Sequence, residues 1–191
     1  FIMMKNNELL KKVSQQLLVI VGFIILSYLY FYPVLTGKKI VQSDMLQVKG
    51  VTHELFEYKQ QNPGEDPLWT NSMFGGMPSY LVVGGKTFNI FYYVKKIITL
   101  GMPGDSVAIL FLLLVGFYFL MQVLRFNKII SVAGAISYAL ASYNIIIISA
   151  GHITKAYALA FVPAVIAGVL LLFDKKYLVG LLVTAFSTGM L

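Results

Sequence analysis

The sequence contains no cysteine and few charged residues. Because cysteine is absent, disulfide bonds, thiolate metal sites and a cysteine nucleophile are all excluded. Charged residues make up 12% of the 191 residues, which is about half the fraction that a soluble domain of this size carries. Hydrophobic residues make up 58%. This composition indicates a protein that is solvated by a lipid bilayer.

The 15 lysines and arginines give a formal net charge of +7, but they do not form a basic patch. They are dispersed at the ends of apolar runs, a pattern typical of membrane helices anchored by cytoplasmic positive charge. A nucleic-acid partner is therefore not indicated. The sequence also has no Gly-rich phosphate loop and no HExxH, GxSxG or EF-hand pattern, so the chemistry of soluble enzymes is not indicated either.

Stretches almost free of charge define the membrane spans, because a helix needs roughly 20 mostly apolar residues to cross a bilayer. We predict an all-α transmembrane fold, a multi-span helical bundle, with spans at residues 13–37, 106–124, 129–154 and 156–173 and the start of a fifth at 177–191. The first run is too long for a signal peptide and lacks an Ala-x-Ala-like cleavage site, so we expect an uncleaved anchor. Since the chain begins at Phe1 and ends within an apolar run, we expect it to be a fragment.

The positions of lysine and arginine also predict the orientation of the chain. A cytoplasmic N-terminus, residues 1–12, places seven basic residues on the inside. These are Lys5, Lys11, Lys12, Arg125, Lys128, Lys175 and Lys176. Residues 38–105 then form a long extracytoplasmic loop. Its own seven lysines weaken this argument from charge, although long loops are translocated largely regardless of charge.

The loop at residues 38–105 is too long for a passive connection, and loops of this length tend to be functional. Residues 43–60 have apolar side chains at helical spacing, which predicts an amphipathic helix lying on the membrane surface. Residues 66–80 are rich in glycine, proline and aromatic residues and include the single tryptophan, Trp69. For Trp69 the alternative to a binding role is a place in the interfacial aromatic belt. Residues 81–94 suit either a short strand or a second surface helix.

Asp44 follows the first span by a few residues, which predicts a position at the outer boundary of the membrane. A partly desolvated carboxylate at this boundary can serve as a general base. The alternative is that Ser43 and Asp44 only cap the N-terminus of the surface helix.

His152 and Lys155 lie three residues apart in a very short outer loop between the third and fourth spans. This topology predicts that they lie on the same face of the membrane as Asp44. A cationic pair at a helix N-terminus can cradle a phosphate. The alternative is that Lys155 reaches the lipid headgroups and His152 caps a helix.

The remaining charged and titratable residues have simpler interpretations. We expect His53, Glu54 and Glu57 to be solvated on the polar face of the surface helix. Anchoring explains the charges at the span ends, including Asp105 and Asp174.

Three segments carry a resemblance to a known family: residues 67–71 (PLWTN), 74–78 (FGGMP) and 150–155 (AGHITK). Together with an acidic residue after the first span, they make the chain resemble the N-terminal part of the bacterial YfhO membrane protein family. That family belongs with the GT-C glycosyltransferases, and its members continue with further spans. The resemblance covers essentially the whole chain and implies a bundle of GT-C type with a long first outer loop.

The resemblance implies that a sugar passes from a polyprenyl-phosphate donor to a cell-envelope polymer or glycolipid on the outer face of the bacterial cytoplasmic membrane. Asp44 matches the position of the base, and His152 and Lys155 would steady the departing lipid phosphate. Trp69 would stack on a sugar ring, with Asn71 as a hydrogen-bonding neighbour. Because Ser43 and Met45 flank Asp44, a second acidic residue is absent. This leaves open whether a divalent cation takes part, and we assign no metal ligand.

Two other classes of function stay open at this stage. A non-catalytic subunit of a membrane or envelope complex would use the long loop for docking. A lipid or sugar transporter would line a path through the bilayer with polar groups, but within the predicted spans we find only uncharged ones such as Ser142, Tyr143 and Asn144. In each case we expect membrane lipids as partners and no nucleic acid.

Overall fold

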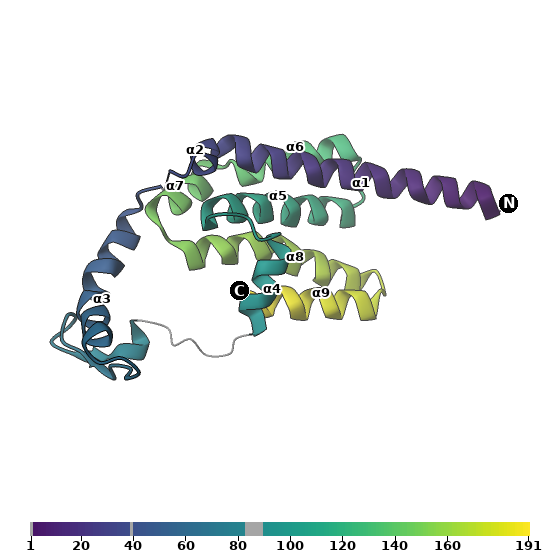
Figure 1. The fold of residues 1–191 in the computed structure, drawn as a ribbon. Helices are drawn as coiled ribbons and strands as arrows, with labels where there is room; N and C mark the ends of the chain where they lie inside the picture. The colour runs from purple at the N-terminus through teal and green to yellow at the C-terminus, as the bar shows by residue number, and fades with distance from the viewer. Residues whose placement is uncertain (1, 39, 83–89) are drawn as a thin grey trace.

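The computed structural model describes residues 2–38, 40–82 and 90–191 and is mostly helical. Its elements in chain order are α1 (Ile2–Tyr30), α2 (Tyr32–Leu35), α3 (Ser43–Gln61), β1 (Trp69–Thr70), β2 (Met77–Pro78), the 3-10 helix η1 (Ser79–Leu81), α4 (Ile90–Ile98), α5 (Asp105–Val123), α6 (Lys128–Ala139), α7 (Ser142–Ala150), α8 (Ile153–Phe173) and α9 (Tyr177–Gly189). Figure 1 shows two parts, a bundle of long helices and a smaller lobe at one end that contains α3 and the two short strands.

The bundle is built around α5, with α1, α6 and α8 packed against it and α9 against α8 (Figure 1). Leucine, isoleucine and phenylalanine occur all round α5, so every face of this helix must be covered by apolar neighbours. Val107, Ile109, Leu110 and Leu114 are completely buried. The helices approach closely at glycine: a Cβ on Gly116 of α5 would lie 2.5 Å from the backbone oxygen of Ala160 in α8.

Three helices in the described residues are long and apolar enough to cross a membrane, at Leu10–Tyr30, Asp105–Val123 and Ile153–Phe173. A fourth span results if α6 and α7 are counted as one broken span. The prediction of an all-α membrane protein is thus confirmed at this level. α9 is apolar but shorter, and it starts at Tyr177 as predicted.

The predicted third span, residues 129–154, is divided in the structure. α6 ends at Ala139, α7 begins at Ser142, and the two axes differ by 44°. Asn144 explains the break, because its side-chain amide donates to the backbone oxygen of Tyr138 at 2.7 Å. A continuous helix would have given that oxygen to the backbone N–H of Ser142. α7 then ends at Ala150, and α8 already includes Ile153 and Thr154.

The first predicted span, residues 13–37, is also shorter as a continuous helix. α1 ends at Tyr30, Phe31 interrupts the helix, and α2 has a proline, Pro33, in its first turn. Proline has no N–H to continue an α-helical ladder, so the chain starts a new short helix here. Gly37, with φ of +77°, then turns the chain toward α3.

The alternating directions of the long helices sort the charged residues to the two ends of the bundle (Figure 1). Lys11 and Lys12 lie toward the same end as the turns after α5 and α8, where Arg125 Nη2 pairs with Asp174 Oδ2 at 3.0 Å. Asp44 and His152 lie at the opposite end. This sorting agrees with the predicted direction of each helix.

In the lobe, α3 runs across the direction of the long helices, as a helix lying on a membrane surface would (Figure 1). Its bounds, Ser43–Gln61, agree with the helix predicted at residues 43–60. β1 and β2 form an antiparallel hairpin with Trp69 opposite Pro78. Of the segment 81–94, residues 83–89 lie outside the described part, and from Ile90 onward the chain is helical.

Candidate functional site

Asp44 and His152, which are 108 positions apart in the sequence, are in direct contact. The imidazole Nδ1 of His152 lies 2.6 Å from Oδ2 of Asp44. The side chains are 49% and 36% exposed, respectively, so the pair is held by the protein and still reaches solvent. The structure thus brings two of the predicted site residues together.

The contact depends on how the start of α3 is attached to the end of α7. The amide of Gln42 donates to the backbone oxygen of Ile148 at 2.6 Å, and the hydroxyl of Ser43 donates to that of Ala150 at 3.3 Å. The Ile148 oxygen also accepts from the backbone N–H of Gly151 at 3.2 Å, so the two side chains add bonds to the carbonyl groups at the C-terminal end of α7. Gly151 then ends α7 with φ of +96°, a left-handed conformation suited to glycine.

Neither side chain of the pair caps a helix, which was the alternative interpretation for both. Gln42, not Ser43 or Asp44, is the N-cap of α3, and Asp44 lies within its first turn. His152 does occupy the N-cap position of α8, but its side chain makes no capping hydrogen bond. Instead, the two side chains contact each other.

Lys155 lies one turn further along α8 and is exposed. Its ammonium is 5.4 Å from the centre of the Tyr143 ring, within the range of a cation–π contact with α7. Because Asp44 and His152 touch each other, a phosphate cannot lie between them. A phosphate held by His152 and Lys155 would have to bind on the solvent side of the imidazole.

The arrangement suits proton transfer. An imidazole N–H that donates to a carboxylate fixes the orientation of both groups. One carboxylate oxygen of Asp44 is used in this contact, and the other is available as a proton acceptor. The same pair can also act with its second imidazole nitrogen, Nε2 of His152, as the acceptor and Asp44 as its orienting partner.

Trp69 and Asn71 are not brought to this pair. They lie in and beside the hairpin, where the backbone N–H of Asn71 donates to Glu54 at 3.0 Å. Glu54 follows Asp44 by ten residues in α3, which corresponds to roughly 15 Å of helix. Trp69 is 55% exposed. A Cβ on Gly76 would come within 2.7 Å of the Trp69 indole nitrogen, so this glycine leaves the space that the ring occupies.

The sequence predicted that Glu54 is solvated on the polar face of α3. In the structure its carboxylate instead accepts hydrogen bonds from the hairpin segment. Its Oε2 accepts hydrogen bonds from the hydroxyls of Ser72 at 2.7 Å and Thr70 at 2.9 Å, and from the Asn71 backbone N–H. These donors, the Ser72 hydroxyl foremost, then the Thr70 hydroxyl and the Asn71 backbone N–H, lower the pKa of Glu54 below its ordinary value of 4.5. The carboxylate fastens the start of the hairpin to α3. The signal in the sequence is the run of three polar donors at residues 70–72.

We predict that Glu54→Gln loosens this attachment. The glutamine amide has one oxygen that can accept, and its NH₂ group would face donors of the hairpin that the carboxylate now binds. The backbone N–H of Asn71 should exchange with deuterium faster than in the parent protein.

Since the pKa of Glu54 is lowered in the folded state, the contribution of Glu54 to stability is complete above about pH 4.5 and is lost as the pH falls through the folded pKa. The matched control is Glu57→Gln, whose exposed partner is His53. Equal exchange in both variants would contradict this role.

A second polar cluster lies where α4, α5 and α8 meet. Lys95 Nζ is 3.0 Å from Oδ1 of Asp105 and 3.9 Å from the centre of the Tyr157 ring, and the Tyr157 hydroxyl donates to the same carboxylate oxygen at 2.8 Å. The sequence suggested only an anchoring role for Asp105 and did not predict its contacts with Lys95 and Tyr157. Two hollows, of about 330 and 370 Å³, share Gly104 and Asp105 in their walls. The second hollow includes Gln42, two residues before Asp44.

Within residues 2–38, 40–82 and 90–191, no group of three or more histidine, aspartate or glutamate side chains is arranged to hold a metal ion. Comparison of the chain with protein-family models, curated proteins and solved structures finds no match.

Proposed function

We propose that this chain is part of a GT-C type glycosyltransferase related to the YfhO family. It would transfer a sugar from a polyprenyl-phosphate donor to a cell-envelope polymer or glycolipid at the outer face of the bacterial cytoplasmic membrane. The observation that supports this proposal best is the contact of 2.6 Å between Asp44 and His152, since it places a half-exposed acid–base pair at one end of a membrane bundle.

In this proposal Asp44 accepts the proton of the acceptor hydroxyl with the oxygen that His152 leaves available. The hydroxyl oxygen then bonds to the anomeric carbon as the bond from that carbon to the phosphate oxygen breaks, with inversion at the carbon. The electron pair of the broken bond stays on the lipid phosphate, whose growing negative charge is stabilised by cationic groups. Lys155 and the solvent-facing side of His152 supply such groups.

Trp69 and Asn71 then have a role further from the reaction. Because the hairpin lies roughly 15 Å along α3 from Asp44, they would contact a distant sugar of an extended acceptor, not the one being transferred. The exposed Trp69 ring suits stacking on a sugar face.

The direct test is a transfer assay with the purified protein in proteoliposomes. A polyprenyl phosphate carrying a radiolabelled sugar is supplied as donor, and isolated cell-envelope polymer as acceptor. We expect label to move to the polymer and free polyprenyl phosphate to accumulate in equal amount. Accumulation of neither product with any of the common hexose donors would count against a transferase.

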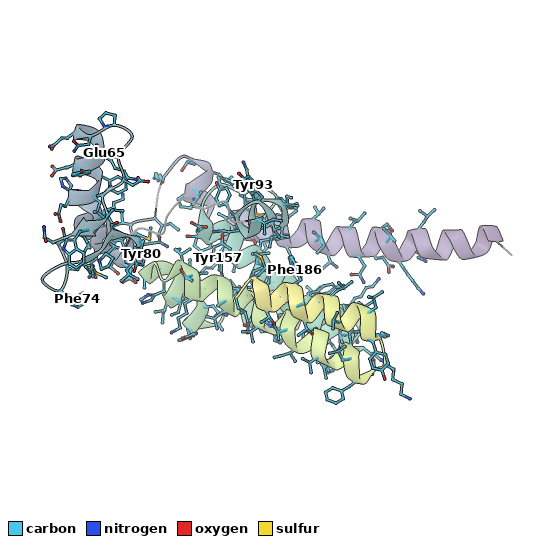
Figure 2. All side chains as sticks on the ribbon, turned by 90° about the horizontal axis from the view of Figure 1, so that it is seen from below. Glu65, Phe74, Tyr80, Tyr93, Tyr157 and Phe186 are labelled. Atoms are coloured by element: carbon cyan, nitrogen blue, oxygen red, sulfur yellow. The ribbon has the colours of Figure 1, made fainter. Side chains whose placement is uncertain are left out.

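A non-catalytic subunit remains the second candidate, favoured by one observation. Leu68, Phe74 and Tyr80 in the lobe are 82%, 88% and 68% exposed, and Figure 2 shows Phe74 at the end of the lobe away from the bundle. Exposed apolar groups of this kind suit a protein partner. If a partner crosslinks to the lobe and sugar transfer in the whole complex is indifferent to Asp44, this candidate replaces the first.

The transporter hypothesis gains less support from the bundle. Among the side chains that the structure describes in the bundle, the buried polar ones are uncharged: Ser27, Ser106, Ser131, Asn144 and Ser187. Charged groups that face a path at membrane depth are the usual mark of transported ions and polar substrates.

A further inference from the structure

The hollow of about 330 Å³ between α4, α5 and α8 lies apart from the contact between Asp44 and His152, and neither residue lines it. Tyr92, Lys95, Lys96 and Thr99 line it from α4 and its C-terminal end. Their spacing of three, four and seven residues places them on one face of the helix. This face carries two ammonium groups, so the hollow is suited to an anion.

The charges in the walls nearly balance. Asp105 pairs with Lys95 at 3.0 Å, which leaves Lys96 as an excess positive charge among the three charged lining residues. The hollow is also at the N-terminus of α5, where the helix dipole favours negative charge. A ligand with a single dense negative charge, such as a phosphate, would therefore be attracted and could share Lys95 with Asp105.

Another face of α4 indicates that the phosphate belongs to a lipid. Ile90, Tyr93 and Ile97, at spacings of three and seven residues, are 70%, 57% and 72% exposed. Tyr93 is labelled beside the bundle in Figure 2. α4 also runs across the long helices (Figure 1). A basic helix with an exposed apolar face lies in the membrane interface and attracts anionic lipids.

We infer that the hollow beneath α4 binds the phosphate of an anionic membrane lipid, whose acyl or prenyl chains lie along the apolar face of the helix. The inference does not depend on glycosyl transfer, because the site is defined by its charges and its position at the interface. Lys96 and Lys95 hold the phosphate, and Asp105 acts as an internal counter-ion that competes with it for Lys95.

This assignment predicts opposite effects for two substitutions in one hollow. Lys96→Gln removes the excess charge and should weaken lipid binding about fivefold, the effect of one basic side chain near an anionic surface. Asp105→Asn should instead tighten binding, since it frees Lys95 while its amide oxygen can still accept from the Tyr157 hydroxyl. A purely structural role of Asp105 would give weaker binding. Lys49→Gln, on the exposed surface of α3, is the matched control with the same change of charge.

The measurement is native mass spectrometry of the full chain in neutral detergent. The probes are phosphatidylglycerol, undecaprenyl phosphate and inorganic phosphate, with zwitterionic phosphatidylcholine as the reference. We expect both anionic lipids to be retained more than phosphatidylcholine, less by Lys96→Gln and more by Asp105→Asn. Binding of inorganic phosphate with the same dependence on Lys96 and Asp105 would support the phosphate site but assign it to a free phosphate. Equal lipid retention by Lys96→Gln and Lys49→Gln, or weaker retention by Asp105→Asn, would overturn the inference.

Discussion

Asp44→Asn will reduce sugar transfer about a hundredfold to ten-thousandfold, the range that a general base contributes. The amide cannot accept the proton of the acceptor hydroxyl at neutral pH. Its oxygen can still accept from Nδ1 of His152, so the attachment of α3 to the turn before α8 should persist. The rate constant with saturating donor is the quantity to measure, since the proposed role of Asp44 concerns the chemical step and not donor binding.

The matched control is Asp66→Asn. Asp66 is also a carboxylate of the lobe with a cationic partner, in this case Lys59, and its side chain is 80% exposed. We expect this variant to transfer sugar at the parental rate. If Asp66→Asn and Asp44→Asn lose activity equally, the effect is a general response to lost charge in the lobe and the base assignment is wrong.

Comparison with His152→Gln separates the two proton acceptors that the pair offers. If Asp44 is the base, His152 only orients it and assists the phosphate, so this variant should lose less activity than Asp44→Asn. If Nε2 of His152 is the base, removing the imidazole should cost at least as much as removing the carboxylate. The identity of the base can therefore be tested by comparing the transfer rates of Asp44→Asn and His152→Gln.

The helices of the bundle could be predicted from the sequence because bilayer solvation leaves a simple signal. A helix such as α5 is apolar on every face, and its predicted range, 106–124, differs from the observed one by a single residue at each end. The break between α6 and α7 could not be predicted, since neither proline nor glycine marks it. The side chain of Asn144, five residues beyond the last residue of α6, competes for a backbone oxygen, and such competition depends on local geometry.

For the candidate site, the sequence could predict only that its residues lie at the same end of the bundle. The alternation of helix direction places Asp44 and His152 at the same end, but their contact depends on hydrogen bonds from Gln42 and Ser43 to α7 that have no pattern in the sequence. Glu54 and Asp105 were missed for the same reason. Each carboxylate is distinguished by donors that approach from other elements, as Tyr157 of α8 approaches Asp105. Chemistry that arises from packing is not visible in the spacing of one segment.

Gly151→Ala will detach Asp44 from His152 and destabilise the end of the bundle where α3 meets α7. A left-handed backbone costs a residue with a Cβ about 1–2 kcal/mol, and Gly151 has φ of +96°. The added Cβ would also lie 2.9 Å from the Cβ of Gln42 and 3.4 Å from that of Asp44, so α3 must move away. Overpacking of this kind costs about 1–3 kcal/mol more. We expect a lower free energy of unfolding in mixed micelles and a loss of sugar transfer.

Gly64→Ala separates the two causes, because Gly64 has nearly the same backbone, with φ of +95°, and nothing within 4 Å of an added Cβ. This control should lose only the stability that the backbone conformation costs, and its sugar transfer should stay at the parental rate. The NMR signal of the His152 imidazole N–H reports the contact itself, and it should shift in Gly151→Ala but not in Gly64→Ala. If Gly151→Ala keeps both that signal and the transfer rate, the pair is held by something other than the tight turn at Gly151. The bonds of Gln42 and Ser43 to α7 would then suffice to hold α3 against the start of α8.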